Sequence, residues 1–231
     1  MRPGERPEIA NLPLFSEMQE AQRERIFSGS FLQVFPPQLT LFELGQHSDF
    51  LHVLVDGLVE LYVHSAGRDT TMRIVEPVTS FILAAVVTDQ PYLMSARTLA
   101  PSRILLVPAA LIRELVKDDP ALMQATMREL AHAYRDMVRA LTDMKLRQSA
   151  ERLGNLILQH ERRQGRTGKL QLKAEKRLLA SLLGMTPENL SRAFGVLSGH
   201  GITVSAAQIT ITDRAALKAF SRPDPVPDDQ C

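Results

Sequence analysis

The sequence predicts an α+β fold made of a roll of short β-strands, one long helix and a smaller C-terminal α/β unit. Three observations favour this fold. Eight short apolar runs, separated by turn residues, fill residues 31–107. A hydrophobic repeat of 3.5 residues follows, and short helical and strand patterns come after it. The 231 residues, 45% of them hydrophobic and 23% charged, suit one large or two small globular domains.

The N-terminal region predicts one helix and a series of strands. Residues 1–8 are polar and proline-rich and are expected to fray, whereas 16–28 should form a helix with Ser16 as its N-cap. The predicted strands occupy 31–35, 39–44, 50–55, 58–64, 70–75, 80–87, 95–99 and 103–107. Asp56-Gly57 between two of these runs indicates a hairpin, because glycine adopts positive φ at little cost. Around eight strands at this spacing are typical of a sandwich or roll.

The apolar repeat predicts a long helix that pairs with a second copy of itself. A short helix is expected over 109–117, and Asp119-Pro120 begins the longer one, because proline suits the first helical turn. Its seam residues recur in alternating steps of four and three: Met123, Met127, Leu130, Tyr134, Met137, Leu141 and Met144. This period is that of a two-helix coiled coil, so we expect a parallel homodimer. The alternative is a helix that packs only on its own domain.

A hinge is expected near 144–149, and a compact unit follows it. Helices are predicted over 149–163, 175–183, 187–199 and 213–220, and strands over 170–172, 202–204 and 208–211. The chain is therefore divided into a roll domain at 1–118, a dimerisation helix at 119–146, a C-terminal domain at 147–222 and a disordered tail at 223–231.

Residues 179–193 match the pattern of a helix-turn-helix. The motif needs a small residue where its helices touch, here Ala180, and a glycine able to adopt positive φ in its turn, here Gly184. The inward positions are apolar: Leu179, Leu183, Met185 and Leu190. Thr186 is a suitable N-cap and Pro187 a suitable first residue for the second helix. With its β-ribbon, the C-terminal domain is predicted to be a winged helix-turn-helix that binds DNA.

The second helix of this motif displays side chains suited to reading bases. Glu188, Ser191 and Arg192 are spaced i, i+3 and i+4, so they share one face near the end that enters the major groove. Arginine bonds guanine bidentately, glutamate accepts from cytosine N4, and serine suits either base. The alternative is an ordinary solvated Glu–Arg pair. Candidate phosphate contacts are Lys173, Lys176, Arg177, Thr186, Asn189 and His200.

In this order, the features resemble the CRP/FNR superfamily of bacterial transcription regulators. The resemblance covers nearly the whole chain and rests on FLHVLVDGLVEL (50–61), DP (119–120), ERL (151–153) and LGMTPENLSR (183–192). It implies a cyclic-nucleotide-binding-like roll, of the double-stranded jelly-roll type, that senses an effector. It also implies double-stranded DNA and RNA polymerase as partners, and a role as an activator, with that of a repressor left open. Glu188, Ser191 and Arg192 look like the FNR-type reader of TTGA half-sites, with Pro187 where the CRP-type reader has arginine, which implies a TTGA…TCAA palindrome.

The resemblance also places an effector pocket that departs from the cyclic-nucleotide members. Those members hold the ligand with Gly-Glu, Arg-Ser and Thr-Ser pairs, and these positions here are Leu83-Ala84, Met94-Ser95 and Met137-Val138. Met94 cannot supply the guanidinium that a phosphate needs, so cAMP is not expected. The pocket is predicted to comprise Phe81, Leu83, Ala84, Met94, Ser95, Met137 and Val138, with Ile82 and Val86 beside them.

Three occupants of this pocket remain open: haem, which would sense nitric oxide or carbon monoxide, an apolar small molecule, or a filled core. The segments FILAA (81–85) and YLMSAR (92–97) are similar to the nitric-oxide-responsive branch of the superfamily. No haem ligand is assigned among the six histidines, which are His47, His52, His64, His132, His160 and His200. An iron–sulfur cluster is not expected, because the single cysteine is Cys231.

Other function classes are disfavoured. HExxH, GxSxG, P-loop and GxGxxG motifs are missing from the sequence, so neither an enzyme nor a metal site is expected. The rival class is a sensory module without DNA binding, of the cupin or cyclic-nucleotide-domain type, but His47, His52 and His64 do not have a cupin's ligand spacing. There is no run of 18 apolar residues and no apolar signal-peptide core at the start, so a cytoplasmic protein is expected.

The charge of the chain is unevenly distributed. The net charge is +1, from 27 Lys and Arg against 26 Asp and Glu. Residues 1–144 carry 13 basic and 18 acidic side chains, whereas 145–231 carry 14 and 8. An acidic roll domain is therefore joined to a basic C-terminal domain, as a phosphate-binding role for the latter requires.

Overall fold

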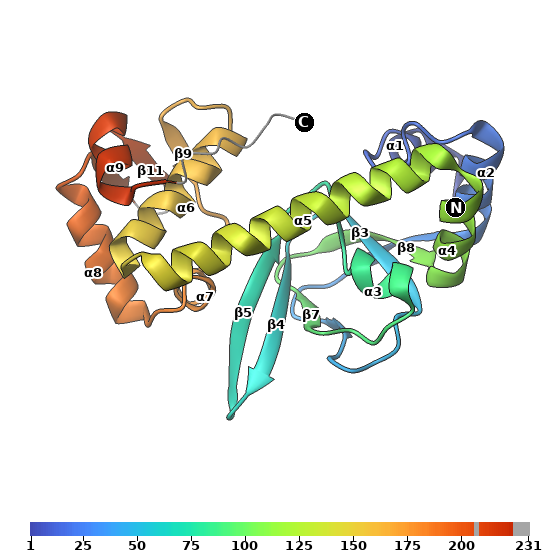
Figure 1. Cartoon of the computed structure of the whole chain (residues 1–231), viewed down its shortest axis with the longest axis horizontal. Helices are drawn as coiled ribbons and strands as arrows, with labels where there is room; N and C mark the ends of the chain where they lie inside the picture. Colours follow the sequence, from blue (N-terminus) through green and yellow to red (C-terminus); the bar gives the residue numbers. More distant parts are fainter. Residues whose placement is uncertain (206–207, 224–231) are drawn as a thin grey trace. The chain divides into compact units, whose positions relative to one another are not determined.

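The computed structural model describes residues 1–205 and 208–223 (Figure 1). The chain divides into two compact units, the first ending at Arg135 and the second beginning at Asp136. The long helix α5, Pro120–Leu146, contributes to both units, because the division falls within it. The predicted α+β class is confirmed. Of the tail predicted over 223–231, all but Pro223 lies outside the described residues.

The N-terminal segment is helical, and the predictions of a frayed end and of a helix starting at Ser16 are wrong. A 3₁₀ turn, α1 and α2 occupy Pro3–Glu5, Arg6–Ala10 and Glu20–Gly29. Ile9 is fully buried in the core, so its burial outweighs the polar composition around it. The N-cap of α2 is Gln19, whose main-chain N–H donates to the Asp119 carboxylate at 3.0 Å.

Eight strands build the roll. They are β1 (Phe31–Phe35), β2 (Thr40–Phe42), β3 (Phe50–Asp56), β4 (Val59–Ser65), β5 (Arg68–Val75), β6 (Thr79–Phe81), β7 (Ser95–Thr98) and β8 (Ser102–Pro108). They form two antiparallel sheets with the orders β1-β8-β3-β6 and β2-β7-β4-β5. Side chains from both sheets meet in one cluster that includes Leu54, Leu61 and Ile104. The alternate residues of β3 and β8, such as Val53 and Leu105, face a second cluster formed with the helices.

Asp56-Gly57 marks a turn but not a hairpin, which corrects the prediction. The strands it joins, β3 and β4, lie in different sheets and do not pair. Gly57 has φ +105°, and a Cβ there would lie 2.6 Å from the Pro101 carbonyl oxygen, so the position requires glycine. The long hairpin in Figure 1 is β4–β5, turned by Ala66 and Gly67, both at positive φ.

The apolar run predicted as a strand over 80–87 changes structure part-way. The strand β6 ends at Phe81, and α3 covers Leu83–Thr88. Ile82 between them has φ +65°, a left-handed conformation that ends the strand. A continuous apolar run fits a buried strand and a buried helix equally well, so the pattern alone could not separate them.

The first turn of α5 is capped as the sequence predicts. The short helix α4, Ala109–Asp118, leads into Asp119, whose Oδ1 accepts from the main-chain N–H groups of Ala121 and Leu122 at 2.9 and 3.0 Å. Leu122 and Ala125 of α5 are then buried against the roll. This end of the long helix is therefore fixed on the first unit.

A carboxylate further along α5 joins the helix to β6. The Ser80 hydroxyl donates to the Glu129 carboxylate. Burial raises the pKa of Glu129 above its usual range, and the Ser80 hydrogen bond, Arg73 and His132 oppose this rise. A carboxyl with a raised folded-state pKa favours the folded protein at low pH and loses that contribution as the pH rises through the folded pKa.

Replacing Glu129 with glutamine is therefore expected to raise the free energy of unfolding at pH 7.5. The amide keeps an acceptor for Ser80 and removes the buried charge. At pH 4, below the ordinary carboxyl pKa of 4.5, the wild-type group is mostly protonated in both states, and the difference should fall close to zero. Urea unfolding of both proteins at pH 7.5 and 4 measures it. A variant less stable than the wild type at pH 7.5 would contradict this account.

The second unit continues with short helices and a small sheet. Its elements are α6 (Ser149–Arg163), β9 (Lys169–Gln171), α7 (Lys176–Leu182), α8 (Pro187–Ser198), β10 (Ile202–Ser205), β11 (Gln208–Ile211) and α9 (Arg214–Ser221). The strands form an antiparallel sheet with the order β10-β11-β9. Leu153, Leu190 and Leu217, from three helices, share one core. Buried Glu161 pairs with Arg214 at 2.7 Å and so links α6 to α9.

Candidate nucleic-acid interface

The helix-turn-helix is built from α7, a turn and α8. Ala180 is fully buried where α7 meets the core, and Leu179, Leu183 and Leu190 are buried around it. Gly184 has φ +61°, the left-handed conformation that the motif requires in its turn. These are the positions and roles that the sequence predicts.

The N-terminus of α8 is capped by a side chain. The Thr186 Oγ1 accepts from the main-chain N–H of Asn189 at 3.2 Å, and Pro187 occupies the first helical position. The same threonine lowers the pKa of Glu188 by a side-chain hydrogen bond, assisted by the main-chain N–H of Glu188 and by Arg192. Glu188 is thereby held as a carboxylate at the start of the helix.

Replacing Thr186 with alanine is expected to lower the free energy of unfolding by about 1 kcal/mol. The main-chain N–H of Asn189, which has no acceptor within the helix, would lose the Thr186 hydroxyl. Thr186→Ser keeps the hydroxyl and should change stability by less than about half of that amount. Urea unfolding of the two variants checks the difference. Equal losses from both substitutions would show that the hydroxyl does not cap the helix.

The three predicted base-reading residues lie exposed on one face of α8. Glu188, Ser191 and Arg192 are exposed, whereas Leu190 and Ala193 are buried on the opposite face. The Ser191 hydroxyl donates to the Pro187 carbonyl at 3.1 Å. The Arg192 guanidinium donates to the Asn189 Oδ1 at 2.6 Å. The face therefore offers a carboxylate, a hydroxyl and a guanidinium within two helical turns.

The predicted phosphate contacts have mixed surroundings. Lys173, Lys176 and Arg177 are exposed. Asn189 is half-buried and is engaged by Arg192. The His200 ring stacks on Phe220, with 4.1 Å between ring centroids, so this histidine also has a packing role that the sequence did not indicate.

Sequence reasoning missed a set of contacts between the end of α5 and the helix-turn-helix. The Met144 side chain lies against Gly184, where a Cβ would be 2.5 Å from the Met144 Cε. The Arg152 guanidinium donates to the carbonyls of Leu183 and Arg147 at 3.0 and 2.9 Å. The predicted hinge contains the only break in helix between α5 and α6, at 147–148. Arg152 spans that break and ties it to the turn of the motif.

The predicted seam is mostly an exposed apolar stripe on α5. The exposed members are Met123, Met127, Tyr134, Met137, Leu141 and Met144. The exposed fractions of Tyr134 and Met137 are both 68%. Leu130 differs, because it packs partly against the core of the roll. Val138 and Leu146 add to the apolar surface beside the stripe.

The predicted effector residues of the first unit divide between two cores. Phe81 belongs to the cluster between the two sheets, with Met94 packed against it, whereas Leu83 belongs to the cluster beneath the helices. The buried Ser95 hydroxyl accepts from the main-chain N–H of Leu44 at 3.0 Å. Ala84 is exposed. Met137 and Val138 lie on the part of α5 that belongs to the second unit, where both are exposed.

One histidine of the roll is deeply buried. His52 is packed among Phe42, Phe81 and Tyr92, with ring centroids 5.0 to 6.5 Å away. Its Nδ1 has no hydrogen-bond partner, and burial lowers its pKa to about 4, so it is neutral at pH 7. Aromatic rings fill the space around it, so a haem could reach this nitrogen only if they moved.

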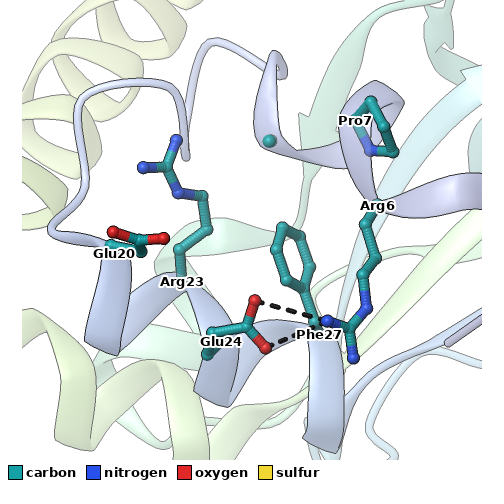
Figure 2. Close-up of a pocket in the computed structure, with 7 residues that line it drawn as sticks. Arg6, Pro7, Glu20, Arg23, Glu24 and Phe27 are labelled. Carbon is teal, nitrogen blue, oxygen red and sulfur yellow. Dashed lines mark hydrogen bonds and ion pairs between the residues drawn. The ribbon is translucent and has the colours of Figure 1, made fainter. Parts of the chain in front are cut away.

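A surface hollow of about 260 Å³ lies elsewhere, at the N-terminal helices. Figure 2 shows the Arg6 guanidinium directed at the Glu24 carboxylate beside Phe27, and the two groups pair at 3.2 Å. Arg23 and Glu20 also line the hollow, so its charges balance. It contains none of the predicted effector residues.

Comparison with known protein families assigns both units. Residues 32–119 match the cyclic nucleotide-binding domain, and residues 151–220 match the Crp-like helix-turn-helix domain. Together the two matches cover more than half of the chain, with the cyclic nucleotide-binding domain before the helix-turn-helix domain. The chain belongs to the CRP/FNR family. Members of the CRP/FNR family are DNA-binding transcription regulators rather than enzymes.

Solved structures share the CRP/FNR fold over most of the chain. FixK2 from Bradyrhizobium japonicum has a TM-score of 0.75 at 17% identity, covering 86% of this chain and 99% of FixK2. A CooA mutant from Carboxydothermus hydrogenoformans has a TM-score of 0.73 at 17% identity, covering 85% and 90%. At these identities the likeness concerns the fold.

One curated relative matches part of this CRP/FNR chain. A cGMP-dependent protein kinase of Plasmodium berghei (strain Anka) is 29% identical over 83 residues, which are 36% of this chain and 9% of the kinase. The chain thus spans about a tenth of that relative. Among the helices of residues 1–205 and 208–223, none is long and apolar enough to cross a membrane.

Proposed function

We propose that this CRP/FNR protein binds, as a homodimer, a DNA palindrome with TTGA half-sites. The observation that carries the proposal is the exposed face of Glu188, Ser191 and Arg192 at the start of α8, backed by buried Leu190 and Ala193. Recognition helices of this motif enter the major groove with their N-terminal residues. Arg192 pairs with the guanine of the half-site, Glu188 accepts from a cytosine N4, and Ser191 bonds a neighbouring base.

The dimer is formed by the exposed stripe of α5. Six apolar side chains at coiled-coil spacing face solvent in the single chain, and a second copy of the helix would cover them. A two-fold dimer presents two reading helices, which suits a palindromic site. Lys173, Lys176 and Arg177 contact phosphates beside the half-sites, and RNA polymerase is the further partner of a cytoplasmic activator.

The effector is other than cAMP. The phosphate-binding arginine of the cyclic-nucleotide members is Met94 here, and the predicted effector residues are mostly apolar. Haem, as a sensor of nitric oxide, or an apolar ligand fits this chemistry better than a nucleotide. By shifting the packing of the seam near Met137, such a ligand would change the spacing of the two reading helices.

Fluorescence anisotropy with a labelled TTGA…TCAA duplex tests the DNA-binding part, with a duplex of scrambled half-sites as the control. We expect the palindrome to bind at least about 1000-fold more tightly than the scrambled duplex at physiological salt. Equal affinity for the two duplexes would refute base-specific reading. Sedimentation at the same concentrations reports the dimer independently.

Two titrations test the effector. Addition of cAMP is expected to leave operator affinity unchanged, and a cAMP-dependent rise would refute our exclusion of that ligand. Addition of haem is followed by absorption spectroscopy. A shifted Soret band together with altered operator affinity supports haem, whereas an unshifted band eliminates haem and leaves an apolar ligand or a filled core.

A further inference from the structure

Gly195 lies inside α8, three residues before its last residue Ser198, where glycine is unfavourable. A glycine inside a helix makes the helix less stable than an alanine does, because glycine loses more conformational freedom than alanine when the chain folds. The other glycine inside a long helix of the second unit has a reason within the chain, since a Cβ at Gly154 would collide with Ser221. At Gly195 an added Cβ meets nothing within 4 Å, and the backbone φ is not positive. Neither the packing nor the backbone of the chain therefore requires glycine at this position.

The position of Gly195 suggests where the requirement lies. It follows Glu188 by seven residues and Arg192 by three, so it shares their exposed face. The buried residues Ala193 and Leu197 lie on the opposite side of the helix. Seven residues of α-helix advance about 10 Å, which is close to the width of about 12 Å of the major groove. A helix whose first turn reads base edges therefore brings residue 195 to the edge of the groove.

We propose that Gly195 is a DNA-contact position, at which the missing side chain lets the sugar–phosphate backbone approach the main chain of α8. This inference rests on the DNA-binding function proposed above and adds a contact to it. It predicts that any side chain at 195 opposes DNA binding while it stabilises the helix.

The test measures stability and affinity for the same full-length variants. Gly195→Ala is expected to raise the melting temperature by about 2–4 °C, because alanine favours the helix and its methyl group has free space. It is expected to weaken operator binding about tenfold, and Gly195→Leu about 100-fold or more, because the added groups crowd the backbone. Ser198→Ala is the matched control, an exposed position one turn nearer the end of α8, and should leave operator affinity within about twofold.

A Gly195→Ala protein that melts at a higher temperature but binds the operator more weakly supports the proposal. If Gly195 had a purely structural role, stability and operator affinity would change in the same direction. Gly195→Ala that binds the operator as the wild type does would overturn it, and so would a loss of stability in that variant. Each protein is also measured on a scrambled duplex at low salt. If the wild type binds both duplexes equally, the TTGA assignment fails, and the Gly195 proposal is judged on the scrambled duplex. If the wild type binds neither duplex, both proposals fall.

Discussion

Leu141→Glu is expected to convert the protein from a dimer to a monomer and to weaken binding to the palindrome by at least about 100-fold. Leu141 is 54% exposed in the single chain and lies in the middle of the second half of the seam. A dimer would bury the new carboxylate without a partner, which costs roughly 3–5 kcal/mol. A monomer engages one half-site at a time and loses the gain from simultaneous engagement of two, commonly a factor of about 10² or more. Sedimentation velocity and fluorescence anisotropy measure the two effects.

Arg135→Glu is the matched control for the seam. Arg135 is exposed on α5, outside the apolar repeat, and its replacement changes the charge by more than Leu141→Glu does. It should leave the protein dimeric. If Leu141→Glu stays dimeric at micromolar concentration, α5 does not form the interface.

Arg192→Ala is expected to weaken operator binding about 10- to 100-fold, equivalent to about 1–3 kcal/mol. The loss should depend on the base that the guanidinium reads. On an operator changed from TTGA to TTAA, the wild type should lose affinity and Arg192→Ala should lose little more. Anisotropy titrations of both proteins on both duplexes form the double cycle that isolates this contact.

Lys218→Ala controls for loss of positive charge. Lys218 is exposed on α9, and its replacement by alanine removes one positive charge from the same domain as Arg192→Ala does. It is expected to keep the preference for TTGA over TTAA. An Arg192→Ala protein that still distinguishes the two duplexes as well as the wild type would show that another residue reads the guanine.

The features that sequence predicted well carry local signals. Asp119-Pro120 begins α5, and Thr186-Pro187 begins α8, because a cap and a proline act through their immediate neighbours. The face of Glu188, Ser191 and Arg192 follows from helical spacing alone. These positions needed no knowledge of what packs against them.

The features that sequence missed depend on distant parts of the chain. Ile9 is buried because the roll offers it a core, although its neighbours are polar. The turn at Gly57 requires glycine because of Pro101, far along the sequence, and the two strands that it joins lie in different sheets. Leu130 fits the seam by spacing but packs partly on the roll. Likewise, Phe81 and Leu83 are neighbours in sequence, yet they face different cores.

The contact of Met144 with Gly184 has a consequence for the length of the operator. Met144 belongs both to the predicted seam and to the packing of the helix-turn-helix turn. In a paired seam, this contact fixes the distance of each turn from the two-fold axis. One extra base pair between the half-sites moves one of them about 3.4 Å along the DNA and roughly a tenth of a turn around it. The number of spacer base pairs would then be a second requirement on the operator, beside the bases that α8 reads.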